Sequence, residues 1–267
     1  IMATYNKTGV AKYYVTTDTH CSPWGHRNGV NGKTIHFDLG DNTAASHFGD
    51  RDYPETMSVA AKIALLGNHD TSVKGVNPGG ESQIYKDNQN KVIFFGLDTG
   101  TTNIETFAIP QSQLDAMARE MSLLENNWDV IVLTHVPLFP GKNAEENAQW
   151  NCGAAWSSTP EDVNEYAAEA FKLLHAFAGR STYTASTGVT YSYAGKNGYI
   201  IGCFAGHIHT HVKCTYEGFP MEAFTTNGYD EWTDDQAYNN VGLYEPDLPY
   251  INVNFNAKTV NGMSYTN

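Results

Sequence analysis

Basic residues are scarce in this sequence. The chain of 267 residues carries 16 Lys and Arg against 29 Asp and Glu, which gives a formal net charge of −13 and a pI near 5.1. A protein that contacts many phosphates of a duplex nucleic acid normally carries basic patches. The longest basic cluster here is His26-Arg27. The composition therefore disfavours duplex nucleic acid as a partner, although a nuclease stays an alternative.

Long apolar runs are also missing. A membrane-spanning helix needs about 18 or more consecutive apolar residues, and the sequence has no such run. Its first residues, Ile1–Asn6, lack the basic and apolar regions of a signal peptide. We expect a soluble protein without a membrane span, and the sequence does not predict its localisation. Because Ile1 is not an initiator methionine, we expect a trimmed, processed or partial chain.

Cysteine is rare. The four cysteines, at positions 21, 152, 203 and 214, form no Cys-x-x-Cys pair. Only Cys203 and Cys214 are close enough in sequence to suggest a bridge between neighbouring strands. We expect free thiols, and the redox compartment stays open.

Five short polar motifs occur in a fixed order, and most of them directly follow an apolar run of the β type. The motifs are Asp18-Thr-His20, Gly40-Asp41, Gly67-Asn68-His69-Asp70, the single His135, and Gly206-His207-Ile208-His209. The runs are Tyr13–Val15, Ile63–Leu66, Val130–Leu133 and Ile200–Ala205. In α/β proteins the carboxyl ends of the strands meet at one edge of the sheet, where ligands bind. The pattern therefore predicts an active site at this edge.

The residue types of the motifs suit a pair of metal ions. A bridging carboxylate can hold two divalent ions roughly 3.5 to 4 Å apart, and a water shared between them loses a proton near neutral pH. Imidazole ligands suit Mn, Zn, Fe, Ni or Co, whereas an all-oxygen set would suit Mg or Ca. We therefore expect two divalent transition-metal ions, whose identity the sequence leaves open.

Each motif taken alone also has a structural explanation. His135 fits a hydrogen-bonded residue at the rim of a sheet, and Asp18-Thr-His20 fits a turn with an Asx cap. Gly40-Asp41 and Gly67-Asn68 are common turn dipeptides. The ordered set of five favours the metal site over these explanations. The histidines without motif support are His26, His36, His47, His175, which we place on a helix face, and His211, which alternates with His207 and His209 and is ambiguous.

From about Tyr13 to His211 the ordered set resembles the calcineurin-like metallophosphoesterase superfamily. The resemblance implies a four-layer α-β-β-α sandwich with mixed β-sheets and a metal site at the strand ends. It implies that Asp41 bridges two ions. The other implied ligands are Asp18, His20 and His209 for one ion, and Asn68, His135 and His207 for the second. The resemblance also implies that His69 stays uncoordinated beside the nucleophile as a catalytic residue, and that Asp70 orients it.

The activity implied by the resemblance is hydrolysis of phosphomonoesters or phosphodiesters by a metal-bridging hydroxide, with a small phosphate ester as the substrate. Gly40-Asp41 is followed by Asn42-Thr-Ala44, in place of the Val-Asp-Arg-Gly of protein Ser/Thr phosphatases and without the tyrosine ligand of purple acid phosphatases. A dedicated protein phosphatase is therefore disfavoured. The alternatives are a nuclease and a non-catalytic or weakly active module of the same fold within a larger assembly. The oligomeric state is not predicted.

We expect a single domain over 1–267, with a cap or insert at 141–198 and a C-terminal hairpin at about 250–262. The insert is rich in aromatic residues, which either overhang the site and stack on a substrate or pack the insert onto the sheet. These residues are Trp150, Trp156, Tyr183, Tyr191 and Tyr193.

Apolar periodicity predicts helices at 109–124 and 160–178. It predicts strands at 12–17, 34–38, 62–66, 92–97, 129–134, 198–205, 211–216, 220–225 and 250–255. One departure from the superfamily lies at 21–33. A helix customarily follows Asp-x-His, but this stretch of the sequence has no helical pattern. Either this connection is a loop, or the sequence omits a segment there.

Overall fold

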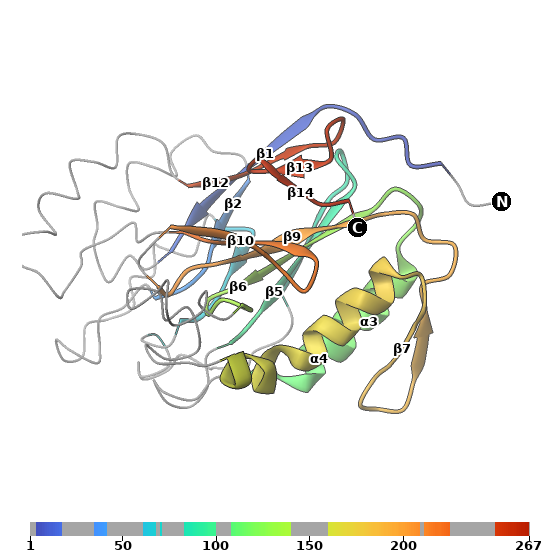
Figure 1. Cartoon of the computed structure of the whole chain (residues 1–267), viewed down its shortest axis with the longest axis horizontal. Coiled ribbons are helices and arrows are strands. Elements are labelled where there is room, and N and C mark those ends of the chain that lie inside the picture. The colour runs from blue at the N-terminus through green and yellow to red at the C-terminus, as the bar shows by residue number, and fades with distance from the viewer. Residues whose placement is uncertain are drawn as a thin grey trace, which may run out of the picture.

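The computed structural model of the chain describes residues 4–17, 35–41, 61–67, 70, 83–99, 108–139, 160–208, 211–224 and 249–266. Two six-stranded sheets dominate these residues (Figure 1). The first sheet has the order β14-β13-β12-β1-β2-β3, and the second has the order β10-β11-β9-β6-β5-β4.

Both sheets are mixed. The strands of the first are β1 (Val10–Thr16), β2 (His36–Asp38), β3 (Ile63–Ala64), β12 (Tyr250–Asn254), β13 (Thr259–Val260) and β14 (Met263–Ser264). Those of the second are β4 (Gln83–Asp87), β5 (Val92–Leu97), β6 (Asp129–Thr134), β9 (Ile200–Ala205), β10 (Val212–Tyr216) and β11 (Phe219–Ala223). Strands β1, β2 and β3 run parallel, as do β5, β6, β9 and β11. Each parallel set therefore delivers its carboxyl ends to one edge of its sheet.

The central strands of the second sheet are buried on both faces, and β5 shows this residue by residue. Val92 and Phe94 pack between the two sheets with residues of the first sheet, whereas Ile93 and Phe95 pack on the opposite face with the helices. A strand covered on both sides is expected to be a continuous apolar run, because neither face meets water. The runs that predicted β5, β6 and β9 have this origin.

Two helices cover the outer face of the second sheet, where Figure 1 shows them side by side. They are α3 (Gln111–Leu123) and α4 (Pro160–Ala178). A small hairpin of β7 (Thr182–Thr184) and β8 (Thr190–Ser192) follows α4. Tyr183 and Tyr193 are buried in the same core, and the Tyr193 hydroxyl donates to the Ala118 carbonyl at 3.2 Å. These contacts favour packing for the two rings, whereas Trp150 and Trp156 lie outside the described residues.

The two sheets are tied to each other at one edge, where β3 faces β4. The Gln83 side-chain amide accepts from the Ala64 N–H at 2.8 Å and donates to the Ala64 carbonyl, as a neighbouring strand would. Gly96 permits the close approach, since a Cβ on it would lie 2.6 Å from Ile63 Cγ2. The segment after β3, which begins the Gly67 motif, is thereby fixed against the second sheet.

The predicted mixed α/β sandwich is confirmed, with helices on the outer face of the second sheet. Within the described ranges no helix covers the outer face of the first sheet. The second helical layer of the predicted four-layer sandwich is therefore not seen among these residues. The predicted strands at 92–97 and 129–134 and the helix at 160–178 coincide with β5, β6 and α4. Strands β4, β7, β8 and β14 were not predicted. The connection at 21–33 lies outside the described residues.

The two cysteines that the structure describes, Cys203 and Cys214, form no disulfide with each other, in agreement with the prediction. Cys203 lies on β9 and Cys214 on β10, and β11 runs between them with Met221 opposite both. The intervening strand keeps the two sulfurs from bonding. Burial raises the pKa of Cys203. No helix in the described ranges has the length and apolar character needed to cross a membrane.

Candidate metal centre

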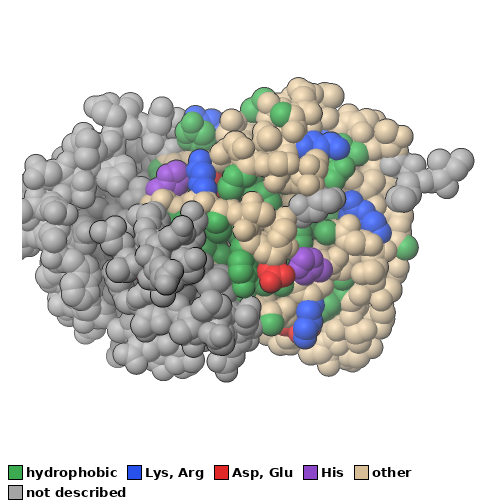
Figure 2. All heavy atoms as spheres, viewed as in Figure 1, with side chains coloured by type: hydrophobic (Ala, Val, Ile, Leu, Met, Phe, Trp, Pro, Cys, Tyr) green, Lys and Arg blue, Asp and Glu red, His purple; other side chains and the backbone are tan. Residues whose placement is uncertain are grey.

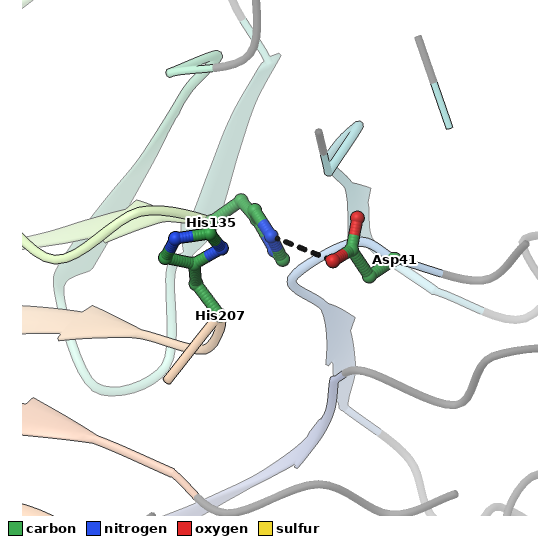
Figure 3. Close-up of side chains that lie close together, drawn as sticks. All are labelled: Asp41, His135 and His207. Carbon is green, nitrogen blue, oxygen red and sulfur yellow. Dashed lines mark ion pairs between the residues drawn. The ribbon is translucent and has the colours of Figure 1, made fainter. Parts of the chain in front are cut away.

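Three of the polar motifs meet in space at the carboxyl ends of their strands. Asp41 follows β2 of the first sheet, whereas His135 and His207 follow β6 and β9 of the second (Figure 3). One potential ligand atom from each of the three residues lies within 4.8 Å of the other two. Asp41 and His135 are buried, and His207 is partly buried. The cluster joins the two sheets at the edge where a ligand site was predicted.

The His135 imidazole has a fixed orientation. Its Nδ1 lies 2.9 Å from the Leu39 carbonyl oxygen, which can only accept, so Nδ1 carries a proton. The other nitrogen, Nε2, lies 3.1 Å from Asp41 Oδ2. In the neutral imidazole Nε2 bears a lone pair, so this nitrogen is available to a cation beside the Asp41 carboxylate. A metal-ligating histidine usually donates its other ring N–H to a backbone carbonyl or a carboxylate, as His135 Nδ1 does to Leu39.

His207 is held beside His135 by the backbone. The Gly206 N–H donates to the His135 carbonyl at 2.9 Å, and the Ile208 N–H donates to the Gly206 carbonyl at 2.9 Å. The His135 and His207 rings have centroids 5.1 Å apart and cross at 72°. The two imidazoles are thus set by strand pairing between β6 and β9 and by the tight turn after β9.

Two members of the cluster have a strained backbone. Asp41 has φ 55° and His207 has φ 71°, which is the left-handed region that residues with a side chain rarely adopt. Each such residue costs on the order of 1–3 kcal/mol and persists only where the surroundings enforce it. Six described non-glycine residues outside the cluster also have a positive φ, so this backbone conformation fixes the two turns without by itself marking them as functional.

The motif glycines Gly40 and Gly67 let the two turns touch. A Cβ on Gly40 would lie 2.5 Å from the Gly67 nitrogen, and a Cβ on Gly67 would lie 2.0 Å from Asp41 Oδ1. Gly40 also has φ 101°, which favours glycine. The Asp41 carboxylate therefore rests directly against the Gly67 backbone, and glycine is required there for steric reasons.

Carboxylates are concentrated around this point. Asp38, Asp41 and Asp70 are all buried. Asp38 Oδ1 accepts from the Gly40 N–H at 3.1 Å, and Asp70 Oδ2 accepts from the Gly67 N–H at 2.9 Å. Burial, followed by the charge of Asp41, raises the pKa of Asp70 to about 7. A bound cation would act in the opposite direction by favouring the charged carboxylates. The donor set of two imidazoles and nearby carboxylates fits a divalent transition metal.

The structure brings three predicted metal ligands together, and their grouping matches the second ion with its bridging carboxylate. Asp70 lies next to them. The other predicted site residues, Asp18, His20, Asn68, His69 and His209, lie outside the described residues. The ligand roles, and the catalytic roles of His69 and Asp70, stay predictions.

The remaining described histidines have partners elsewhere. His211, which the sequence left ambiguous, places Nε2 2.7 Å from Glu222 Oε1. His175 lies exposed on α4, as predicted, with Nε2 3.2 Å from Glu217 Oε2. His36 is buried, with Nε2 2.8 Å from Thr16 Oγ1. These contacts are separate from the cluster of Asp41, His135 and His207.

Two buried residues near the site were not singled out from the sequence. Asp98 and Thr99 directly follow β5, and the Thr99 hydroxyl accepts from the N–H of Val136, the residue after His135. The signal that found the other motifs, a polar residue directly after an apolar run, is present here too.

Comparison with known proteins gives likenesses among solved structures only, since no family model and no curated protein matches the chain. A purple acid phosphatase from yellow lupin (Lupinus luteus) is similar over 99% of this chain and 54% of its own, with 10% identity and a TM-score of 0.48. A candidate 5'-nucleotidase from Staphylococcus aureus, solved with alpha-ketoglutarate, is similar over 82% of this chain and 49% of its own, with 14% identity and a TM-score of 0.41.

Both solved structures are less than 25% identical to this chain. The present chain spans about half the length of each. Because both TM-scores lie below 0.5, the chemistry of this chain is inferred from its own residues.

Proposed function

We propose that this chain is a hydrolase of phosphate esters that holds two divalent transition-metal ions. The observation that carries the proposal is the cluster of Asp41, His135 and His207, whose ligand atoms lie within 4.8 Å of one another. When bound, two such ions would supply a deprotonated water as the nucleophile and would neutralise the phosphoryl oxygens.

Each residue has a distinct part in the proposal. Asp41 would bridge the two ions, and its position is fixed by the left-handed backbone and the contact with Gly67. His135 and His207 would bind one ion through nitrogens that the Leu39 carbonyl and the turn after β9 orient. The ligands proposed in addition are Asn68 for the same ion and Asp18, His20 and His209 for the other.

His69 would stabilise or protonate the leaving alkoxide, because a histidine has the pKa range for this task. Asp70 would orient His69. The Asp70 carboxylate is itself fixed by the Gly67 N–H, which makes it a rigid partner for the preceding residue. Neither role requires a covalent intermediate on the protein.

The substrate proposed is a small phosphate ester. The formal charge of −13 opposes binding to a polyanion. On the face shown in Figure 2 the Lys and Arg side chains of the described residues lie in separate places and form no continuous stripe. Phosphomonoesters and small diesters are both compatible with these features.

The test is turnover of p-nitrophenyl phosphate and of its bis ester by metal-free protein, before and after addition of Mn or Zn. We expect turnover only with metal, and loss of turnover in His135→Ala. The matched control is His175→Ala, which removes an exposed histidine on α4 and should leave turnover unchanged. Equal turnover of wild type and His135→Ala would contradict the proposal.

A further inference from the structure

Strand β5 supplies no proposed ligand, yet the two residues that follow it lie between segments that do. Thr99 is buried, and its Oγ1 accepts from the Val136 N–H at 2.8 Å. The Thr134 hydroxyl donates to the Val136 carbonyl at 2.8 Å. The peptide groups on both sides of Val136 are thus bonded by buried hydroxyls, and the preceding residue is His135.

Asp98, the residue before Thr99, is fixed by contacts with helix α3. Its backbone N–H donates to Gln113 Oε1 at 2.8 Å, and its Oδ2 accepts from Gln113 Nε2 at 3.1 Å, so α3 fixes the residue through two hydrogen bonds. Burial raises the pKa of Asp98, against the smaller lowering effect of the hydrogen bond from Gln113. Gly96, two residues before Asp98, lies against the segment that leads to Gly67, since a Cβ on it would lie 2.6 Å from Ile63 Cγ2 and 2.8 Å from Leu65 Cδ2.

The end of β5 is therefore in contact with both halves of the site. On one side Thr99 bonds the segment that carries His135, and on the other Gly96 packs against Ile63 and Leu65, which lead to the Gly67 turn that supports Asp41. Metal ligands need to be held within about 0.5 Å of their working geometry by residues that are themselves locked in place. Asp98 and Thr99 are locked in this way, because both are buried in a rigid strand end.

We propose that Thr99, fixed in place by the neighbouring contact between Asp98 and Gln113, is a positioning residue that sets the separation between His135 Nε2 and the Asp41 carboxylate, and hence the affinity for the metal. This inference rests on the proposed function. It differs from a purely structural role, in which the same hydrogen bonds would stabilise the fold and leave metal binding unchanged.

The test is a binding isotherm of the full chain with Mn alone, without substrate. Thr99→Val keeps the shape of the side chain and removes the acceptor of the Val136 N–H, so we expect metal affinity to fall on the order of tenfold, the low end for residues behind the ligands. Thr99→Ser keeps the hydroxyl and should restore wild-type affinity.

Tyr13→Phe is the matched control. It removes a buried hydrogen bond of 2.9 Å to Asp87, which pairs with the opposite end of β5. We expect it to lower the melting temperature as Thr99→Val does, with metal affinity unchanged. The inference is overturned if Thr99→Val binds Mn like wild type, or if Tyr13→Phe weakens binding equally. A wild-type chain that binds no metal overturns the proposed function as well, whereas normal binding by Thr99→Val overturns the positioning role alone.

Discussion

His135 Nε2 lies 3.1 Å from Asp41 Oδ2, although the two residues follow strands of different sheets. The contact spans the interface of the sandwich at the edge where the parallel strands end. Since the Leu39 carbonyl fixes the proton on His135 Nδ1, the nitrogen that faces the carboxylate is the one left to bind a cation. This relationship joins the fold to the proposed chemistry.

Asp41→Asn should be the most damaging single ligand change, because a bridging carboxylate serves both ions. We expect metal affinity to fall by more than the roughly 10- to 100-fold typical of residues behind the ligands, with a matching loss of turnover. Metal analysis after dialysis checks this. Asp115→Asn, at a carboxylate on α3 that bonds Ser186, is the control and should keep its metal. Full metal content and rate in Asp41→Asn would place the bridge elsewhere.

Gly67→Ala should impair the site by steric displacement. The added Cβ would lie 2.0 Å from Asp41 Oδ1, so the carboxylate must move. We expect loss of metal binding in a chain that still folds, as judged by circular dichroism. Gly188→Ala, at a turn with φ 80° and no atom within 4 Å of the new Cβ, should cost only about 1–2 kcal/mol of stability. Normal metal binding by Gly67→Ala would refute the proposed contact.

Strands β5, β6 and β9 could be predicted from sequence because burial on both faces produces continuous apolar runs. Strand β4, with the sequence Gln83-Ile-Tyr-Lys-Asp87, was missed since it is a half-exposed edge strand. Asp41 and His135 could be placed near strand ends from the sequence, because each follows a predicted strand, at 34–38 and at 129–134. The Leu39–His135 hydrogen bond could not, because it depends on how the two sheets are aligned across the interface, which periodicity along one strand does not encode.

His69→Ala should lower kcat roughly 10²- to 10⁴-fold with both metals retained, the range for removal of a positioned acid or charge stabiliser. The defect should shrink for p-nitrophenyl esters, whose leaving group needs little protonation, and stay large for alkyl esters. Rates on the two ester classes, measured together with metal content, check this. An equal defect for both classes would indicate stabilisation of phosphoryl oxygens, and a loss of metal would make His69 a ligand.

Alkaline pH should destabilise the fold through its buried tyrosines. Burial raises the pKa of Tyr13, Tyr193 and Tyr265. The unfolded chain then loses protons above about pH 10 that the folded chain retains, so stability is full below that pH and falls as pH rises, by at most about 1.4 kcal/mol per pH unit for each tyrosine. Urea unfolding between about pH 9 and pH 11 measures this slope. Tyr13→Phe should flatten it, and an unchanged slope would contradict the assignment.

The number of metal ions bound per chain tests the central claim most directly. Metal-free protein is dialysed against Mn or Zn, freed of excess ion, and analysed for metal and protein. The proposed site predicts close to two ions per chain, lost again on treatment with chelator. One ion or none after reconstitution would contradict the two-metal site.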